Sequence, residues 1–231
     1  MRRIGVLGGM SWESTAEYYR LLNTEVAARL GGLHSADLLL RSVDFATVEE
    51  LQVAGAWDRA GELLGDAAAE LEAGGAELLV LATNTMHKVA DAIQARTRIP
   101  LLHLGDTTAS AVRAAQVHRV GLLGTAFTME QDFYVDRLRS HGLDVVVPPA
   151  EDRAEVHRVI YDELCRGQVL DSSRDAYLEV IGRLADRGCT GVILGCTEIE
   201  LLLPMAAAHG TPLFPTTRLH VAAAVDAALA P

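Results

Sequence analysis

The 231-residue sequence has few aromatic residues, one lysine and no long apolar run. Aromatic residues make up 5% of the chain, whereas hydrophobic residues make up 50%, with alanine, leucine, valine and glycine prominent. A transmembrane helix needs a run of about 18 or more apolar residues, so no segment is predicted to span a bilayer. The composition favours an α/β protein with a sizeable core and close packing of helices on sheets.

Basic residues are outnumbered by acidic ones, 20 to 31. The formal net charge is −11, which disfavours nucleic acid and anionic membrane surfaces as partners. An acidic ligand is not excluded, because backbone N–H groups and helix N-termini can line a site while the outer surface stays negative.

The three cysteines, Cys165, Cys189 and Cys196, form neither an even set nor a zinc-type spacing. We therefore predict reduced thiols, no bound metal and a cytoplasmic protein. The N-terminal apolar run is interrupted at Gly8 and Gly9, and is shorter than the apolar region of a signal peptide.

Signals for a cofactor are also missing. Gly8 and Gly9 follow a predicted strand but lack the full GxGxxG spacing of a dinucleotide site. Lys88 is the only residue that could hold pyridoxal phosphate as a Schiff base, and it lies inside a predicted helix. We interpret Lys88 as a cation at the surface or behind the site, and predict that no cofactor is bound.

Two apolar runs end in small polar triplets. LLVLATNTMHK at residues 78–88 contains Thr83-Asn84-Thr85, and GVILGCTEIE at residues 191–200 contains Cys196-Thr197-Glu198. Apolar runs of this length are typical of buried parallel strands. Ligands of open α/β sheets bind at the carboxyl ends of strands, so a hydroxyl and a thiol are predicted to face a site.

The order of motifs repeats along the chain, which indicates a duplication. Four segment pairs recur in the same order: residues 4–9 with 120–125, 15–19 with 130–134, Thr83 with Cys196, and 99–102 with 211–214. The predicted strands are residues 3–7, 36–44, 78–82, 101–104, 119–123, 144–147, 191–194 and 213–214. The predicted helices are residues 14–29, 46–73 with a break near Gly55, 86–96, 107–115, 153–166, 173–186 and 220–229.

Alternating strands and helices predict parallel sheets with right-handed crossovers. We expect two pseudo-symmetric lobes, each a parallel four-stranded sheet flanked by helices, with the active site in the interlobe cleft. The N-terminal lobe is expected to comprise residues 1–98 and 213–231 and to carry Thr83. The other lobe, residues 99–212, is expected to carry Cys196.

Two proton carriers on opposite sides of a small ligand are what inversion at a carbon acid requires. A cysteine is suited to this role, because its ordinary pKa of about 8.5 can be shifted into the working range by its surroundings. The developing carbanion must be stabilised by donors aimed at its carboxylate. Asn84, Thr85 and Thr197, together with the N–H groups that open the following helices, are placed to supply them.

Three segments resemble the aspartate/glutamate racemase superfamily of pyridoxal-independent enzymes. They are GVLGGMSWEST at residues 5–15, ATNTMHK at residues 82–88 and GCTE at residues 195–198. The resemblance covers essentially the whole chain. It implies two lobes that each donate one proton-transfer residue to an amino-acid substrate, and it implies a homodimer.

The first proton-transfer position holds Thr83 where the family has cysteine. This pairing, with the segments at residues 31–35 and 128–134, is similar to the racemases specific for L-aspartate and L-glutamate. That likeness implies that Cys196 removes the α-proton of the L-amino acid and that Thr83 lies on the reprotonating side. The predicted substrate contacts are Met10, Gln52, Asn84, Thr85, Thr125, Thr197 and Glu198.

Other interpretations of single residues stay open at this point. Glu198 could favour the dipole of a following helix or contact the substrate amine or the thiol. His87 could tune the site or simply pack, and Cys165 and Cys189 have the pattern of ordinary buried thiols. The alternative functions are a related cysteine-dependent isomerase or decarboxylase of small dicarboxylates, and a catalytically silent amino-acid-binding protein.

Overall fold

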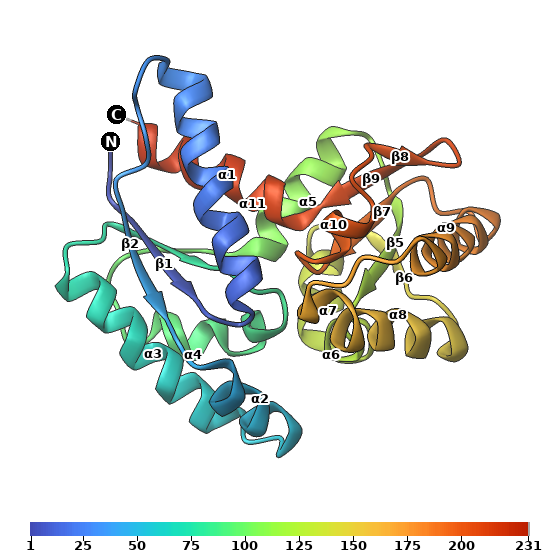
Figure 1. Cartoon of the computed structure of the whole chain (residues 1–231), viewed down its shortest axis with the longest axis horizontal. Helices are drawn as coiled ribbons and strands as arrows, with labels where there is room; N and C mark the ends of the chain where they lie inside the picture. The colour runs from blue at the N-terminus through green and yellow to red at the C-terminus, as the bar shows by residue number, and fades with distance from the viewer. Residues whose placement is uncertain (231) are drawn as a thin grey trace. The chain divides into compact units, whose positions relative to one another are not determined.

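The computed structural model describes residues 1–230 and divides them into two compact units, each built on its own sheet (Figure 1). The first unit comprises Met1–His103 and the residues from His220 onward, and the second comprises Leu104–Leu219. The expected α/β class is confirmed, with a parallel four-stranded sheet in the first unit, whereas the sheet of the second unit has four parallel strands and a fifth strand at its edge.

The sheet of the first unit has the strand order β2-β1-β3-β4, and all of its pairings are parallel. Its strands are β1 (Ile4–Gly8), β2 (Leu38–Ser42), β3 (Leu78–Leu81) and β4 (Leu101–Leu102). Its helices are α1 (Trp12–Leu30), α2 (Phe45–Val53), α3 (Trp57–Ala73), the 3-10 helix η1 (Thr85–Val89) and α4 (Ala90–Gln94).

Strand β1 explains why the central strands are continuous apolar runs. All five of its residues are buried. Leu7 packs in the cluster that contains residues of α3, while Ile4 and Val6 pack in the cluster that contains residues of α1. Alternate side chains thus enter cores on opposite faces of the sheet, so neither set can be polar.

The predicted break near Gly55 is confirmed. Helix α2 ends at Val53 and α3 begins at Trp57, and Gly55 between them has φ +66°, a left-handed conformation that glycine adopts without strain.

The second unit has the strand order β6-β5-β7-β9-β8. Its strands are β5 (Arg119–Gly124), β6 (Asp144–Val146), β7 (Val192–Gly195), β8 (Ala207–Ala208) and β9 (Thr211–Pro215). The first four in the order pair in parallel, and the short β8 adds an antiparallel edge that the sequence did not predict.

Helices α5 (Leu104–Ala114), α6 (Ala126–Glu130), α7 (Asp132–Ser140), α8 (Ala150–Asp162), η2 (Leu164–Arg166), α9 (Asp171–Asp186) and α10 (Ile199–Leu202) belong to the second unit. Helix α11 (Thr216–Leu229) begins there, and its later residues Val221, Ala224 and Val225 pack in the core of the first unit. The units therefore divide after residues 103 and 219, whereas the sequence placed the divisions after residues 98 and 212. The difference arises because β4 pairs with β3 and β9 pairs with β7.

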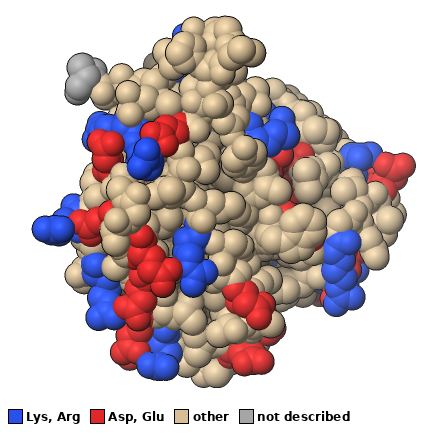
Figure 2. All heavy atoms as spheres, turned by 60° about the vertical axis from the view of Figure 1, so that its left-hand side comes forward, with Lys and Arg blue, Asp and Glu red and all other residues tan. Residues whose placement is uncertain are grey.

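Acidic and basic side chains are interspersed on the surface shown in Figure 2. Many of them form ion pairs, including Arg41 with Glu70 at 2.6 Å and Arg119 with Asp144 at 2.7 Å. Pairs this exposed contribute little to stability. Across residues 1–230, no helix is both long enough and apolar enough to cross a membrane.

Candidate active site

The first polar triplet begins where β3 leaves its sheet. Ala82 N–H still donates to Leu7 O at 2.9 Å, but Thr83 N–H donates to Leu81 O of its own strand at 2.9 Å, which turns the chain out of the ladder. Thr83, Asn84 and Thr85 are only 7%, 5% and 6% exposed. The hydroxyl and amide groups predicted to bind substrate are therefore held in a largely enclosed position at the carboxyl end of the strand.

The loop after β1 lies at the same end of the sheet and is tightly fixed. Gly9 has φ +97°, and a Cβ at this residue would lie 2.2 Å from Val43 O, so only glycine fits. Gly9 N–H donates to Thr15 Oγ1 at 2.7 Å, and that hydroxyl donates to Ser11 O at 2.8 Å. These bonds hold the segment that carries Met10, which is 6% exposed.

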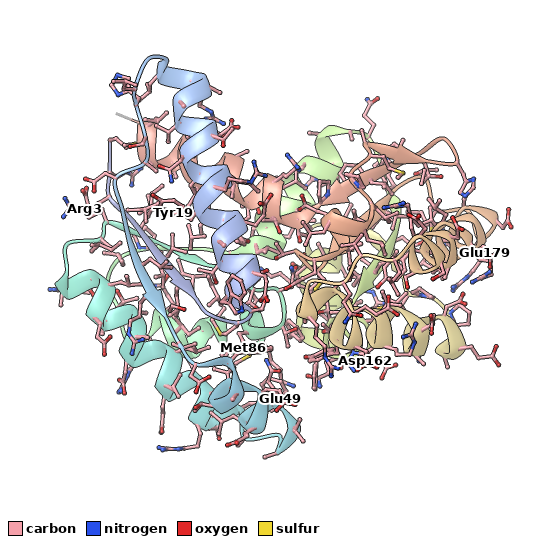
Figure 3. The ribbon with its side chains drawn as sticks, in the orientation of Figure 1. Arg3, Tyr19, Glu49, Met86, Asp162 and Glu179 are labelled. Atoms are coloured by element: carbon pink, nitrogen blue, oxygen red, sulfur yellow. The ribbon has the colours of Figure 1, made fainter. Side chains whose placement is uncertain are left out.

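Helix α2 places Gln52 against Met86, the residue that follows the Thr83-Asn84-Thr85 triplet. Gln52 Nε2 lies 2.9 Å from the sulfur of Met86, a residue labelled in Figure 3 near the end of the sheet toward which β1 and β2 point. Gln52 is 4% exposed, and its Oε1 has no hydrogen-bond partner within residues 1–230. Because an unpaired buried acceptor is costly, this oxygen suits a site that receives a donor from a bound molecule.

His87 fixes the other side of the Thr83 loop. His87 Nδ1 lies 2.7 Å from Thr83 O, and since a carbonyl only accepts, Nδ1 carries the hydrogen. The ring is 3% exposed and its centroid lies 4.7 Å from that of His103. Burial, followed by the charges of His103 and His220, lowers the pKa of His87 well below its ordinary value. His87 is therefore a neutral donor.

His220, on α11, completes an imidazole cluster, which we define as His87, His103 and His220. Its ring lies 5.9 Å from that of His87. Nε2 donates to Leu102 O at 2.8 Å, so Nδ1 of the neutral ring accepts from the Tyr18 hydroxyl at 2.9 Å. Burial lowers the pKa of His220 to about 4. His87 and His220 are thus both held uncharged next to the Thr83 loop.

In the second unit, two glycines bring the site-bearing strand ends close together. Gly124 of β5 pairs with Gly195 of β7, and the next residues along the chain are Thr125 and Cys196. A Cβ at Gly195 would lie 2.8 Å from Leu123 O, and one at Gly124 would lie 3.0 Å from Gly195 O. Larger residues would force the strands apart at the level of Cys196.

Cys196 forms a buried pair with Glu198. The thiol donates to Glu198 Oε2 at 3.0 Å, and the two residues are 9% and 4% exposed. Burial, and then the charge of Glu198, raises the pKa of the Cys196 thiol well above its ordinary value. Two adjacent negative charges would be costly here, so the resting pair is a thiol beside a carboxylate.

A second thiol reaches the same carboxylate. Cys165, on η2 and half-buried, donates to Glu198 Oε1 at 3.9 Å. The sequence predicted an ordinary buried thiol, because nothing in a separation of 33 residues indicates this contact. His103 and His220 were likewise not singled out by the sequence, since only the fold gathers them around His87.

The two predicted threonine contacts of the second unit are both buried. Thr125 is the N-cap of α6, and its Oγ1 accepts from Thr128 N–H at 3.3 Å. Thr197, which lies between Cys196 and Glu198, is 5% exposed. Within residues 1–230, no group of three or more His, Cys, Asp or Glu side chains is arranged to hold a metal ion. The site residues of the first unit and those of the second unit thus include groups that can transfer protons and groups that can donate hydrogen bonds to an anion.

Comparison with known proteins gives a consistent result. The family model for Asp/Glu/hydantoin racemases matches residues 7–224. The crystal structure of a candidate Asp/Glu racemase from Yersinia pestis is 51% identical, with a TM-score of 0.93 over 100% of both chains. An aspartate racemase homologue from Pyrococcus horikoshii OT3 is 33% identical, with a TM-score of 0.85 over 99% of both chains. A glutamate racemase of Pseudomonas paraeruginosa is 31% identical over 137 residues, which span 58% of this chain and 49% of that protein.

Proposed function

The chain belongs to the Asp/Glu/hydantoin racemase family and is a racemase, and on that premise we propose that it inverts the α-carbon of aspartate or glutamate without a cofactor. The observation that carries the proposal is the buried contact of 3.0 Å between Cys196 and Glu198. It joins a thiol to a carboxylate that can accept its proton, which is the arrangement an activated proton-abstracting sulfur needs.

In the proposed reaction, Glu198 takes the thiol proton and the Cys196 thiolate removes the α-proton of the L-amino acid. The pair carries one negative charge before and after this step, and the positive α-ammonium of the substrate stabilises that charge on the sulfur. The hydroxyl of Thr83 delivers or relays a proton to the opposite face of the same carbon. Three protons are moved: from the thiol to Glu198, from the α-carbon to the thiolate, and from Thr83 to the α-carbon. Glu198 then releases its proton to solvent and Thr83 regains one from solvent, so the atoms and charges balance and no redox step is needed.

Binding groups for both ends of an amino acid are available in this scheme. Asn84, Thr85 and Thr197 are proposed to donate to the carboxylate on which the carbanion charge develops. Gln52 Oε1, a buried acceptor with no partner within residues 1–230, suits the α-ammonium. Met10 and Thr125 are proposed to shape the rest of the substrate site.

We propose a preference for the L-substrate. A threonine hydroxyl is a far weaker acid than a thiol, so Thr83 gives up or relays a proton more easily than it begins the reaction as a base. Turnover from L-aspartate or L-glutamate is therefore expected to be faster than from the D-enantiomer at saturation. The final ratio of enantiomers cannot change, because a catalyst lowers one barrier shared by both directions.

The test is chiral chromatography after incubation with L- and D-aspartate and glutamate, without added cofactor or metal. Wild-type protein should convert each enantiomer to the racemate, and Cys196→Ala should no longer exchange the α-hydrogen of the L-substrate with heavy water. Retained exchange in this variant would remove Cys196 from the mechanism. Calorimetric binding of aspartate by the wild type without any exchange would instead identify a catalytically silent binding protein.

A further inference from the structure

We propose that His87 is a positioning residue, whose Nδ1–H holds the Thr83 loop so that the Thr83 hydroxyl can serve the second proton transfer. The inference rests on the proposed function and assigns His87 a role that acts through Thr83. Its basis is the bond of 2.7 Å between Nδ1 and Thr83 O, made by a ring that is 3% exposed.

The orientation of this ring is set by its surroundings rather than by chance packing. The titratable side chains that face His87 are His103, at a ring distance of 4.7 Å, and His220, at 5.9 Å. His220 is itself fixed through both nitrogens, by Leu102 O and by the Tyr18 hydroxyl. Helices α1 and α11 and strand β4 thus support a ring that holds the carbonyl of Thr83.

The second loop has a different arrangement at the matching position. The offset that relates Thr83 to Cys196 relates His87 to Glu200. Glu200 accepts from Arg218 at 2.9 Å, and Cys196 O accepts from the backbone N–H of Ile199 at 3.2 Å. The carbonyl of Cys196 is therefore bonded within its own backbone turn, whereas that of Thr83 is bonded by a side chain. An imidazole positions the weaker proton carrier.

Two variants separate the position of the donor from the volume of the side chain. In His87→Asn, the amide nitrogen lies the same number of bonds from Cα as Nδ1, so the donor is kept although the side chain is smaller. In His87→Gln, the volume is closer to that of histidine, but the donor lies one bond further out. A positioning role predicts that His87→Asn is the milder variant, whereas a packing role predicts the opposite order.

The experiment follows inversion and α-hydrogen exchange of L-aspartate in heavy water for wild type and both variants. A misplacement of about 1 Å in a reacting group costs about 100-fold in rate, so His87→Gln should lose inversion by about that factor. It should retain exchange of the L-enantiomer without inversion, because Cys196 acts on its own face. His87→Asn should keep both activities, with thermal unfolding measured for each protein.

The possible failures can be told apart. If inversion and exchange fall together in His87→Gln, or if His87→Asn is the more severe variant, the positioning role is overturned while the racemase proposal stands. If the wild type neither inverts nor exchanges its substrate, the proposed function fails and this inference fails with it. As a check independent of activity, the imidazole nitrogen resonances of the wild type should show a protonated Nδ1 and a bare Nε2 at His87. The reverse tautomer would contradict the bond to Thr83.

Discussion

Among single residues, Cys196 and Glu198 are the pair on which the proposed proton transfer depends. Burial and the neighbouring carboxylate both disfavour the thiolate, so the pKa of Cys196 is raised well above its ordinary value. In the proposed reaction, the sulfur of Cys196 is thus held as a thiol until its proton is transferred. The same carboxylate that disfavours the thiolate is the group that we propose accepts that proton, because it lies 3.0 Å from the sulfur.

The pH dependence of activity should reflect this pair. We expect kcat/KM for the L-substrate to keep rising with pH beyond about 8.5, the ordinary pKa of a cysteine. Glu198→Gln removes the carboxylate charge, so the thiol pKa, followed by thiolate ultraviolet absorbance, should fall while racemisation at neutral pH also falls. Faster racemisation by this variant would show that Glu198 only disfavours the thiolate and accepts no proton.

Replacing the weaker proton carrier should change the balance between the two directions. Thr83→Cys substitutes a thiol for a hydroxyl, and a thiol can begin the reaction as a base because its pKa lies much closer to neutrality. The turnover numbers from the L- and D-substrates should become more alike. An unchanged preference, measured at saturation, would show that the binding pocket and not the acid decides the direction.

At the scale of helices and strands, close approaches and buried contacts hold the site in place. The carboxyl ends of β5 and β7 meet through Gly124 and Gly195, and α11 contributes His220 to a contact with α1 and β4. These contacts join segments far apart in the chain. Their removal should be detectable in stability as well as in activity.

Gly195→Ala tests the close approach of β5 and β7. The added methyl would lie 2.8 Å from Leu123 O, so the strands must separate, at a cost of about 1–3 kcal/mol in the free energy of unfolding. Gly182→Ala, inside α9, is the control. No atom lies within 4 Å of its new methyl among the described residues, and it should stabilise by about 0.5–1 kcal/mol. Equal effects in urea unfolding would contradict the argument.

His220 should make the protein sensitive to mild acid. The unfolded chain binds a proton at this residue near pH 6.5, whereas burial lowers the folded pKa to about 4. The unfolded state therefore binds more protons between these values. The contribution is fully present above pH 6.5 and is lost as pH falls toward 4, by up to about 1.4 kcal/mol per pH unit. His87 acts in the same direction.

Urea unfolding between pH 4.5 and 7.5 measures this slope. His220→Gln cannot be protonated, so its free energy of unfolding should depend less steeply on pH than that of the wild type, although the variant is less stable overall. The remaining slope reports the carboxylates and the other histidines. An identical slope in the two proteins would mean that His220 is not held neutral in the folded state.

At the scale of the whole molecule, the duplication is visible in the strand order. The orders β2-β1-β3-β4 and β6-β5-β7-β9 are the same. The match of residues 15–19 with 130–134 needs a correction of one residue. Tyr18 and Tyr134 are both fully buried, whereas Tyr19 is 55% exposed, so Tyr18 corresponds to Tyr134. With Tyr18 matched to Tyr134, this pair of segments has the same offset in residue number as β1 and β5.

The assembly state is a prediction that follows from the family resemblance. Light scattering coupled to size exclusion should give a mass near twice the 24.7 kDa of one chain. A mass of one chain at the concentrations used for activity assays would contradict the homodimer. The protein can also be diluted until the dimer dissociates. If activity per chain is unchanged at that concentration, the racemase does not depend on the dimer.

The sequence by itself determined the parallel strands, the duplication and the two polar triplets. These depend on local composition, because a strand buried on both faces must be apolar along its length and must end where polar residues begin. It did not determine the segment after Thr83. Residues 86–96 were predicted to be one helix, but the chain forms η1 and then the short α4. The bond from His87 to Thr83 O accompanies this tighter first turn.

Only the tertiary structure decided which side chains meet. Tyr18 and His220 are 202 residues apart, and Cys165 and Glu198 are 33 apart, so no local pattern could relate them. Helices α6 and α7 were also missed, since each is short and stabilised by packing on the second unit rather than by its own sequence. Local periodicity sets which residues are buried, whereas burial partners, and the pKa shifts that they cause, depend on the path of the chain in space.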